Sequence, residues 1–393
     1  MSKKGCRVFQ RKMRKELLES ATNYPVVTLM GPRQSGKTTL VRKTFPDKPY
    51  VNLERLDTRE LATSDPEGFI RHYPEGAILD EIQAAPHLFS SIQVRVDETK
   101  KKGEFILTGS HQMALHEAIS QSLAGRTAIL HLLPLSIEEL QAAGAHKEVD
   151  ELLLEGCYPA VQSERLNPTK TYANYVATYL ERDIRKMMQM RNIALFEKFL
   201  VLTASRIGHI INKEGVAGEV GVDAKTIEQW LSILEACYII YRLHPYFENF
   251  GKRVIKSPKI YFCDVGLASY LLGIETQTQV ARDPLRGNLV ENLVVMELMK
   301  ARFNRGLDPK LSFFQVSGRS EVDLIFQRGR ELVPIEIKSS RTFNTSFLQG
   351  IKKFEKIAGD RIADSFLIYT GEQEATVKGT HLINVRNSSK VVE

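Results

Sequence analysis

No stretch of this sequence reaches the roughly 20 consecutive apolar residues that a helix needs to cross a bilayer. Residues 1–20 are basic but contain neither an apolar core nor a small-residue cleavage site, so we expect a cationic amphipathic helix there and not a secretory signal. Cysteines are few and far apart, without the paired spacing of a zinc site: Cys6, Cys157, Cys237 and Cys263. We therefore expect a cytoplasmic protein with reduced thiols and no membrane contact.

Low-complexity tracts, internal repeats and a strong charge imbalance are also absent. The sequence has 54 Lys and Arg against 47 Asp and Glu, a formal net charge of +7, which permits a polyanionic partner but does not establish one. With 43% hydrophobic and 26% charged residues and a mean hydropathy of −0.22, the composition is that of a soluble globular protein. Its 393 residues exceed one ordinary domain, so we expect two or three.

A glycine-rich segment follows the apolar residues 26–30 and precedes a helical pattern. It reads GPRQSGKT and matches G-x-x-x-x-G-K-[ST] in the strand–loop–helix context that makes this motif specific. Backbone N–H groups of such a loop point at phosphate oxygens, and the following helix adds the positive end of its dipole. Lys37 would reach the β- and γ-phosphates, and the Thr38 hydroxyl would bind Mg²⁺. The sequence thus predicts ATP and Mg²⁺ as cofactors, with a nucleotide site made of Gly31, Pro32, Arg33, Gln34, Ser35, Gly36, Lys37, Thr38 and Thr39.

An acidic pair follows a second short apolar stretch, in the sequence GAILDEIQ. Asp80, at the end of this expected strand, would complete the Mg²⁺ shell, and Glu81 would orient and activate the attacking water. A solvated carboxylate pair is the alternative interpretation, because Asp-Glu is common at the ends of strands.

Two later segments add candidates for contacts to the γ-phosphate. GEFILTGSHQ is an apolar strand that ends in the hydroxyl residues Thr108 and Ser110, and the carboxyl ends of parallel strands converge on the nucleotide. One of these hydroxyls would sense the γ-phosphate through the attacking water, or would cap a helix. Arg126, in LAGRTAIL, would act as an arginine finger from the same or a neighbouring subunit; the alternative is an ordinary surface arginine.

Several of these segments together resemble one family. GPRQSGKTTL, AILDEIQ, FILTGS and LAGR…LPLSIEEL are similar to the ATPase core of bacterial and archaeal AAA+ proteins that carry an appended C-terminal domain of unknown function. The resemblance continues through YLERDI and SPKIYFCDVGLASYLLG, so it covers nearly the whole chain. It implies a nucleotide-driven machine that often works as a ring or other oligomer, and therefore a homo-oligomer here.

Residues 206–280 have the outline of a winged helix-turn-helix. A tight turn at residues 221–223 separates two helical patterns, and Asp223 is placed to cap the second. The residues predicted to contact DNA are Lys225, Thr226 and Gln229 on the second helix, and Lys252, Arg253, Lys256 and Lys259 on the wing between two strands. Such modules also bind proteins or form ATPase lids, so a purely structural role stays open.

The segment EVDLIFQRGRELVPIEIKSS, residues 321–340, has the pattern of a β-hairpin with a glycine at its tip. A helix and a strand are expected before it, and a helix and further strands after it. This order resembles the core of the restriction-endonuclease-like fold. Within that resemblance, the residues that match the nuclease motif are Glu291, Asp323, Glu336 and Lys338.

Metal chemistry explains why a nuclease needs these residue types. Asp323 and Glu336 on adjacent strands, with Glu291, would bind one or two Mg²⁺ ions, which activate water and stabilise charge on the scissile phosphate. Lys338 shares a strand face with Glu336 and would orient the water or screen the phosphate; Gln349 on the next helix would assist. The alternative is an acid–lysine pair on an inherited fold that binds DNA or partners without cutting.

The expected architecture is α/β and has four parts. They are a P-loop AAA+ ATPase core with a parallel sheet and an N-terminal basic helix (1–135), a helical lid (136–205), a winged helix-turn-helix (206–280) and an α/β restriction-endonuclease-like domain (281–393). The leading hypothesis is an ATPase that remodels or translocates DNA, with cleavage at the C-terminal site. The alternative is a nucleotide-dependent switch whose C-terminal domain only docks partners.

Overall fold

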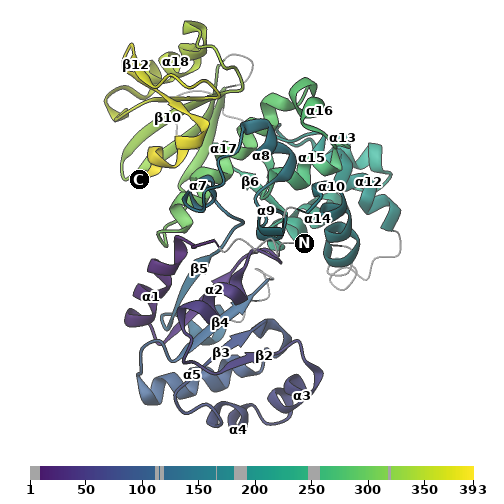
Figure 1. The fold of residues 1–393 in the computed structure, drawn as a ribbon, viewed down its shortest axis with the longest axis vertical. Helices are drawn as coiled ribbons and strands as arrows, with labels where there is room; N and C mark the ends of the chain where they lie inside the picture. The colour runs from purple at the N-terminus through teal and green to yellow at the C-terminus, as the bar shows by residue number, and fades with distance from the viewer. Residues whose placement is uncertain are drawn as a thin grey trace, which may run out of the picture.

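The computed structural model describes residues 9–110, 115, 119–164, 166–180, 193–246, 257–316 and 320–393. In Figure 1 an N-terminal α/β unit lies at the bottom, a mainly helical middle segment at the right, and a C-terminal sheet at the upper left. Among the described residues, no helix combines the length and apolar character needed to span a membrane.

The N-terminal unit is built on five strands that are all parallel, in the order β2-β3-β4-β1-β5. The central strands are apolar and buried on both faces, as a parallel sheet between helices requires. Residues of α1 and α2 pack on one face and residues of α4 and α5 on the other. The predicted parallel-sheet P-loop ATPase fold is therefore confirmed. The strands are β1 (Val26–Met30), β2 (Tyr50–Asn52), β3 (Ala77–Asp80), β4 (Phe105–Gly109) and β5 (Thr127–His131). The helices are α1 (Met13–Asn23), α2 (Lys37–Thr44), α3 (Leu56–Ser64), α4 (Pro66–Arg71) and α5 (Leu88–Thr99).

The middle segment consists of short helices and one two-stranded antiparallel sheet, β6 (Ile240–Leu243) with β7 (Lys259–Phe262). Tyr158, Tyr172 and Tyr175 pack in one buried aromatic cluster. The helices are α7 (Ile137–Ala142), α8 (Val149–Glu155), α9 (Pro159–Glu164), α10 (Pro168–Tyr175), α12 (Ile193–Ala204), α13 (Lys213–Val220), α14 (Ala224–Ala236), α15 (Val265–Leu271) and α16 (Gln277–Arg282).

A helix-turn-helix is formed by α13 and α14. Gly221 ends α13 with φ of 93°, a conformation that glycine adopts without strain. The side chain of Asp223 then caps α14 by accepting a 2.8 Å hydrogen bond from the N–H of Thr226. Trp230 lies on the buried face of α14 with its ring edge-to-face against Phe199. The turn, the cap and the buried face are placed as the sequence predicts.

The C-terminal unit begins with the long helix α17 (Arg286–Phe303) and continues into a six-stranded mixed sheet of order β12-β13-β11-β10-β9-β8. Strands β8, β9 and β10 form an antiparallel meander, and β11 lies parallel to β10. The expected order of helix, meander, helix and further strand is therefore present. The remaining elements are β8 (Leu311–Val316), β9 (Ser320–Arg328), β10 (Glu331–Lys338), α18 (Gln349–Ala358), β11 (Phe366–Tyr369), β12 (Ala375–Val377) and β13 (Thr380–Asn384).

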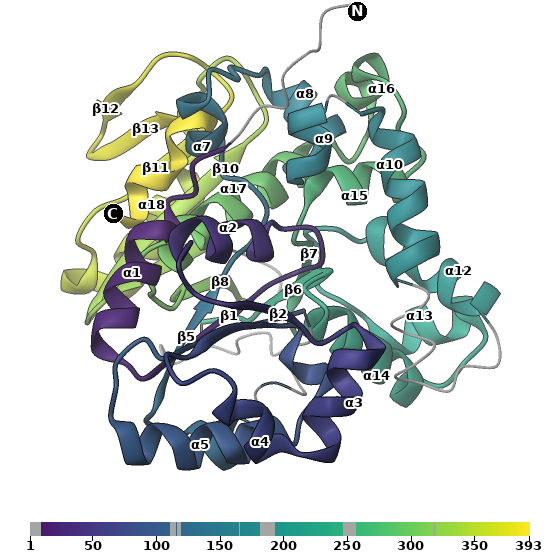
Figure 2. The same cartoon turned by 60° about the horizontal axis from the view of Figure 1, so that its bottom comes forward.

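Helix α17 connects the parts of the molecule. It is buried along most of its length and contacts α8, α15, β7 and β10. Its apolar residues belong to one hydrophobic core that also contains Val26 of β1 and Ile335 of β10. Figure 2 shows α17 between the C-terminal sheet and the helices of the middle segment.

Candidate functional site

The phosphate loop, residues 31–38, leaves the carboxyl end of β1 and opens α2. Gly31 passes so close to the residue after β5 that a Cβ there would lie 2.1 Å from the carbonyl oxygen of Leu132, so no side chain fits. Gly36 has φ of 93°, in the left-handed region. Lys37 Nζ lies inside the loop, 2.9 Å from the carbonyl oxygen of Gly31. The loop therefore has the tight curl that a phosphate-binding loop requires.

The carboxylate of Asp80 accepts hydrogen bonds from three hydroxyl groups of neighbouring elements at this edge of the sheet. Thr38 Oγ1 lies 3.1 and 3.0 Å from its two oxygens, Tyr50 Oη donates to Oδ2 at 2.7 Å, and Thr108 donates to Oδ1. Asp80 is buried. Hydroxyl and carboxylate oxygens are the ligands that Mg²⁺ prefers. The structure thus brings Thr38 and Asp80 together, and their donor atoms fit a magnesium ion bound beside a triphosphate.

Glu81 has a left-handed backbone, with φ of 57°, a strained conformation that is common at functional sites. Its Oε2 accepts hydrogen bonds from Ser110 Oγ, at 3.0 Å, and from Gln83 Nε2. Burial acts to raise the pKa of Glu81, but the ammonium of Lys37 and these hydrogen bonds outweigh it and hold the pKa below its ordinary value. Glu81 is therefore ionised at neutral pH, as a general base must be.

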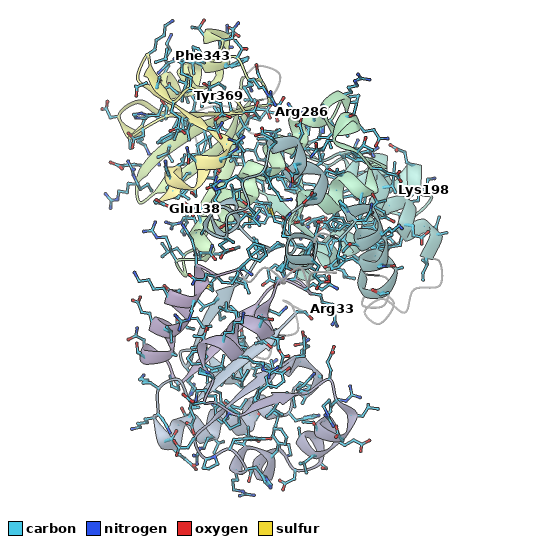
Figure 3. All side chains as sticks on the ribbon, viewed as in Figure 1. Arg33, Glu138, Lys198, Arg286, Phe343 and Tyr369 are labelled. Atoms are coloured by element: carbon cyan, nitrogen blue, oxygen red, sulfur yellow. The ribbon has the colours of Figure 1, made fainter. Side chains whose placement is uncertain are left out.

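Lys37 itself is almost completely buried. Burial lowers its pKa, and the charges of Glu81 and Asp80 offset only part of this effect. Arg33 forms an ion pair with Glu54, 3.3 Å from Nη1 to Oε1. Figure 3 shows Arg33 where the N-terminal unit faces the helical middle segment. The cationic side chains of the loop thus have acidic partners close to them within the N-terminal unit.

Arg126 lies at the opposite end of the sheet from the phosphate loop. It precedes β5, whose first residue pairs with Val26 at the start of β1, whereas the loop follows Met30. Five extended residues separate these two ends by roughly 16 Å. The guanidinium forms an ion pair with Asp97, 2.6 Å from Nε to Oδ1. The prediction of an arginine finger from the same subunit is therefore wrong, and a contact from a neighbouring subunit stays a prediction.

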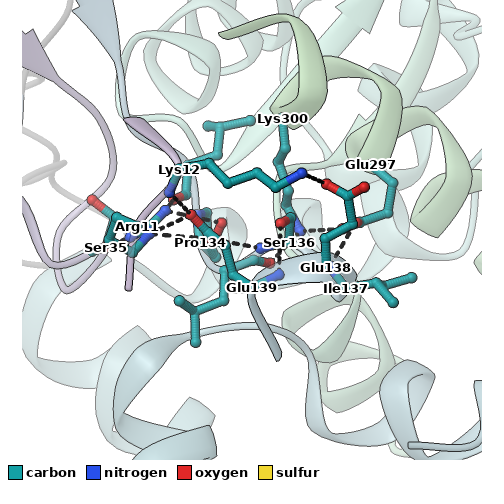
Figure 4. A network of polar contacts seen from close by, with 12 residues as sticks. Arg11, Lys12, Ser35, Pro134, Ser136, Ile137, Glu138, Glu139, Glu297 and Lys300 are labelled. Atoms are coloured by element: carbon teal, nitrogen blue, oxygen red, sulfur yellow. Dashed lines mark hydrogen bonds and ion pairs between the residues drawn. The ribbon is translucent and has the colours of Figure 1, made fainter. Parts of the chain in front are cut away.

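A residue of the N-terminal segment also contacts the phosphate loop. Arg11 donates a 2.6 Å hydrogen bond from Nη1 to the carbonyl oxygen of Ser35, and another of 2.6 Å from Nη2 to that of Leu133. Its Nε lies 3.1 Å from the carboxylate of Glu139, and both side chains are buried. Figure 4 shows these contacts around the start of α7. Arg11 thus ties the phosphate loop to the capping box of α7, in which Glu139 pairs with Ser136.

The same stretch is bound from the other side by α17. The N–H of Ile137 donates to Glu297 Oε2 at 2.7 Å, and Lys300 Nζ donates to the carbonyl oxygen of Leu135 at 2.8 Å. Glu297 and Lys300 also form a buried ion pair of 2.7 Å. A continuous series of polar contacts therefore leads from the phosphate loop through α7 to the helix that begins the C-terminal unit (Figure 4).

A second group of charged residues lies where β9 and β10 pair. Lys338 Nζ lies 2.5 Å from Glu336 Oε1 and 3.6 Å from Asp323 Oδ2. Asp323 Oδ2 also accepts a 2.8 Å hydrogen bond from the N–H of Ile337. Both carboxylates are 9% exposed, and the lysine side chain is 32% exposed. The structure thus brings together three of the four predicted nuclease residues and leaves them within reach of solvent.

The fourth predicted residue, Glu291 on α17, has lysine and tyrosine partners from β7. Lys259 Nζ lies 3.1 Å from Glu291 Oε1 and 2.7 Å from Glu321 Oε1, and Tyr261 donates its hydroxyl proton to Glu291. Burial, together with the charge of Asp323, raises the pKa of Glu291 to about 7 and that of Glu336 to about 8. In the part of the chain that the structure describes, no three His, Cys, Asp or Glu side chains are grouped to hold a metal ion.

The predicted DNA-contacting residues have different outcomes. Lys259 is 3% exposed, so its prediction as a phosphate contact on the wing is wrong, because two carboxylates of the C-terminal unit bind it. On α14, Lys225 and Gln229 are exposed, and the Thr226 hydroxyl lies 3.1 Å from the capping carboxylate of Asp223. The remaining three wing residues, Lys252, Arg253 and Lys256, lie outside the described residues.

The motif-based predictions did not include Arg11, Tyr50 and Gln83. Gln83 follows Asp80 by three residues in DEIQ, so its proximity to Glu81 carried a local signal. Tyr50 and Arg11 reach the site through the pairing of β2 with β3 and through the packing of the N-terminal segment on α7. Neither contact has a sequence signal, because both depend on long-range packing.

Comparison with known families divides the chain into three matched segments. Residues 23–141 match the model described as an AAA domain. Residues 146–278 and 286–387 match two models described as domains of unknown function, DUF8612 and DUF4143. The first segment, which contains the phosphate loop, Asp80 and Glu81, is thus an AAA-type ATPase domain.

Two proteins that are similar over most of the chain are described as uncharacterized. One from Mycobacterium tuberculosis is 29% identical over 388 residues, covering 96% of this chain and 83% of that protein. One from Methanocaldococcus jannaschii is 23% identical over 402 residues, covering 87% and 81%. Among solved structures, a Walker-type ATPase of Pyrococcus abyssi is 15% identical with a TM-score of 0.46, covering 67% of this chain and 96% of that one. AMPPCP-bound DnaA from Aquifex aeolicus is 12% identical with a TM-score of 0.28, covering 57% and 85%.

Proposed function

We propose that this protein is an ATP-hydrolysing AAA+ protein that acts on DNA and carries a metal-dependent nuclease centre in its C-terminal unit. The observation that carries the ATPase part is the position of Thr38, Asp80 and Glu81 together at the phosphate loop. Hydroxyl and carboxylate side chains of these types are the ones that phosphoryl transfer uses to bind Mg²⁺ and to orient the attacking water. The family match of residues 23–141 agrees with this assignment.

The chain's own groups have distinct roles in hydrolysis. The loop N–H groups and Lys37 would bind the β- and γ-phosphates. Thr38 and Asp80 would hold Mg²⁺, which would supply positive charge beside the transferred phosphoryl group. Glu81 takes a proton from the attacking water. Ser110 and Gln83, both in contact with Glu81 Oε2, orient that carboxylate. Because the base is already ionised at neutral pH, no preceding deprotonation is required.

DNA is the proposed partner because two surfaces suit a nucleic-acid backbone. The exposed face of α14 presents Lys225 and Gln229 at a capped helix start, where a recognition helix meets DNA. The C-terminal centre places an acid pair and a lysine on adjacent strands, the residue types that a phosphodiester-cutting site uses. The wing between β6 and β7 adds basic residues in sequence.

Homo-oligomer formation belongs to the same proposal. Arg126 cannot reach a nucleotide in its own subunit, but its side chain is partly exposed and could face a neighbouring subunit if its ion pair with Asp97 opened. An arginine supplied in trans stabilises transition-state charge and raises the rate by about 10³ to 10⁵ in ATPases and GTPases. Light scattering with and without ATP measures the assembly, and Arg126→Ala should lower hydrolysis only where the protein is oligomeric.

A second candidate function is a nucleotide-dependent switch whose C-terminal unit binds partners without cutting. One observation favours it: two of the three candidate nuclease carboxylates already pair with lysines, Glu336 with Lys338 and Glu291 with Lys259. In this candidate, the ion pairs are structural. ATP hydrolysis would then be indifferent to DNA.

ATP hydrolysis and its response to DNA are tested by measuring phosphate release. The proteins compared are wild type, Lys37→Ala and Glu81→Gln, each with and without linear, circular and branched DNA. We expect Lys37→Ala to lose ATP binding, and Glu81→Gln to bind ATP but hydrolyse it about 10² to 10⁴ times more slowly. Stimulation by DNA, together with DNA binding that weakens steeply with salt, supports action on DNA. ATP hydrolysis that no DNA changes would support the switch.

Cleavage is tested separately with Mg²⁺ or Mn²⁺ on the same DNA substrates. Asp323→Asn should abolish cutting while leaving ATP hydrolysis intact. Glu331→Gln is the matched control, because this carboxylate lies at the exposed start of β10. Equal behaviour of wild type and Asp323→Asn on every substrate would remove the nuclease centre from the proposal and leave the ATPase in place.

A further inference from the structure

Lys259 belongs to the middle segment, but its side chain is buried among carboxylates of the C-terminal unit. It begins β7, which pairs with β6 in the middle segment, yet its Nζ lies 3.1 Å from Glu291 Oε1 on α17 and 2.7 Å from Glu321 Oε1 on β9. The ring of Phe313 lies 5.5 Å from the same nitrogen. Only 3% of Lys259 is exposed.

Burial of this lysine is stabilised mainly by the carboxylates around it. Burial alone lowers a lysine pKa, but the charges of Glu291, Asp323 and Glu321 raise the pKa of Lys259 above its usual range. The charge of Asp323 therefore stabilises the ammonium of Lys259, although Asp323 itself contacts Lys338 and the backbone N–H of Ile337. The ammonium groups of Lys259 and Lys338 thus face the same collection of carboxylates.

The neighbouring carboxylate of Glu336 has capacity left for a further cation. Its Oε1 contacts Lys338, whereas its Oε2 is buried and has no hydrogen-bond partner among the described residues. A Cβ on Gly350 of α18 would lie 3.0 Å from this oxygen, so only glycine leaves the space beside it clear. A buried, unpartnered carboxylate oxygen is costly, and a cation is the ligand that satisfies it.

We propose that Lys259 is the internal counter-ion of the C-terminal carboxylate centre and competes with a divalent cation for it. This inference rests on the metal centre of the proposed function. Asp323 and Glu336 supply oxygen ligands of the kind that Mg²⁺ and Mn²⁺ take, and the fixed positive charge of Lys259 repels an ion bound there. Cation binding is therefore weak while β7 remains in place and becomes stronger when the middle segment withdraws Lys259.

The competition depends on how two parts of the chain are packed, because Lys259 comes from the middle segment and the carboxylates come from the C-terminal unit. Both neighbours of its Nζ belong to the C-terminal unit, whereas its backbone is held by β6 and by a bridge to Ile210. A displacement of the middle segment relative to α17 therefore removes this charge, together with the hydrogen bond that Tyr261 of β7 donates to Glu291.

The experiment is calorimetric titration of Mn²⁺ into the full-length protein without nucleotide or DNA. Lys259→Met keeps the length of the side chain and removes its charge; we expect its Mn²⁺ dissociation constant to fall by about tenfold or more, which corresponds to about 1.4 kcal/mol. Lys259→Arg keeps the charge and should remain at the wild-type value. Lys310→Met, an exposed lysine at the start of the same sheet region, is the control for general loss of charge.

A double variant assigns the gain to this centre. Lys259→Met combined with Asp323→Asn should return to weak binding, whereas Mn²⁺ bound at the phosphate loop would be insensitive to Asp323. Circular dichroism checks the fold, and Lys259→Gln, which still donates hydrogen bonds, replaces Lys259→Met if the methionine variant is unfolded. Unchanged Mn²⁺ affinity in the charge-removing variant, no binding by any variant, or a gain that survives Asp323→Asn would overturn the inference.

The outcome is distinguishable from failure of the proposed nuclease. A Lys259→Met protein that binds Mn²⁺ more tightly and cuts no DNA keeps the counter-ion role and removes only the cleavage activity. A protein that cuts DNA but shows the same Mn²⁺ affinity with and without Lys259 keeps the nuclease and removes the counter-ion role.

Discussion

Arg11 Nη1 and the carbonyl oxygen of Ser35 are 2.6 Å apart, so a residue from before the first helix is bonded to the backbone of the phosphate loop. The carbonyl that accepts this bond belongs to the residue just before Gly36. Arg11 also neutralises the buried Glu139. One guanidinium therefore stabilises the loop that holds phosphate and the helix that follows the ATPase sheet.

Replacing Arg11 by methionine should destabilise the protein and weaken nucleotide binding together. The change leaves the carboxylate of Glu139 buried without its cation, which costs about 3–5 kcal/mol in comparable pairs. Urea unfolding and titration with a nucleotide measure the two effects. Lys12→Met is the control, because the Lys12 ammonium pairs with Glu138 at the surface and such pairs contribute about 0–1 kcal/mol. Equal stability of the two variants would contradict this role of Arg11.

The pair Glu297–Lys300 should be strongly coupled in a double-mutant cycle. Lys300→Met leaves Glu297 charged and buried, at a cost of about 3–5 kcal/mol, whereas Glu297→Gln with Lys300→Met should cost less than the sum of the single changes by about 1–3 kcal/mol. Thermal or urea unfolding measures the change in unfolding free energy for each variant. Glu355 and Lys352 have the same spacing on α18 but are partly exposed, so their cycle should give at most about 0.5 kcal/mol. Additive effects at Glu297 and Lys300 would disprove the coupling.

Tyr50→Phe should raise the Mg²⁺ concentration needed for ATP hydrolysis. The Tyr50 hydroxyl donates to Asp80 Oδ2 at 2.7 Å, and partners that orient a metal-binding carboxylate are worth about 10- to 100-fold in metal affinity. Hydrolysis rates measured over a Mg²⁺ series test this. Tyr24→Phe, at an exposed tyrosine, should leave the curve unchanged. A lower maximal rate with an unaltered Mg²⁺ requirement would place Tyr50 outside the metal site.

Cys157 should resist alkylation in the folded protein. Burial raises the pKa of its thiol to about 12, so at pH 8 only about one thiol in 10⁴ is ionised. The pKa is raised in the folded state, so raising the pH toward 9 should still leave the native thiol almost entirely protonated. Mass spectrometry after iodoacetamide treatment measures labelling, and the same protein in urea is the control. Rapid native labelling of Cys157 would show that the middle segment opens.

Sequence alone located the elements of the site that are local in the chain. The phosphate loop is one run of residues that lead from β1 into α2, and Asp80 and Glu81 end a strand, so pattern and order suffice to place them. The cap at Asp223 and the apolar face around Trp230 are equally local, because helical periodicity determines both. These predictions needed no knowledge of which strands pair.

The predictions that failed required long-range pairing. Arg126 precedes an apolar stretch, but only the parallel register of β5 with β1 shows that it lies at the far end of the sheet. Lys259 occurs in a basic stretch, which is typical of an exposed surface, yet its partners Glu291 and Glu321 are far away in sequence. No local pattern marks a lysine whose charge is neutralised by another part of the chain.

Helix α17 is a single uninterrupted rod of 18 residues, on which Glu291 and Glu297 are six residues, or roughly 9 Å, apart. Glu297 holds the backbone at the start of α7, and Glu291 holds the lysine of β7. A rotation or shift of α17 would therefore move both contacts together, so the geometry around α7 and the geometry around β7 are linked through one helix.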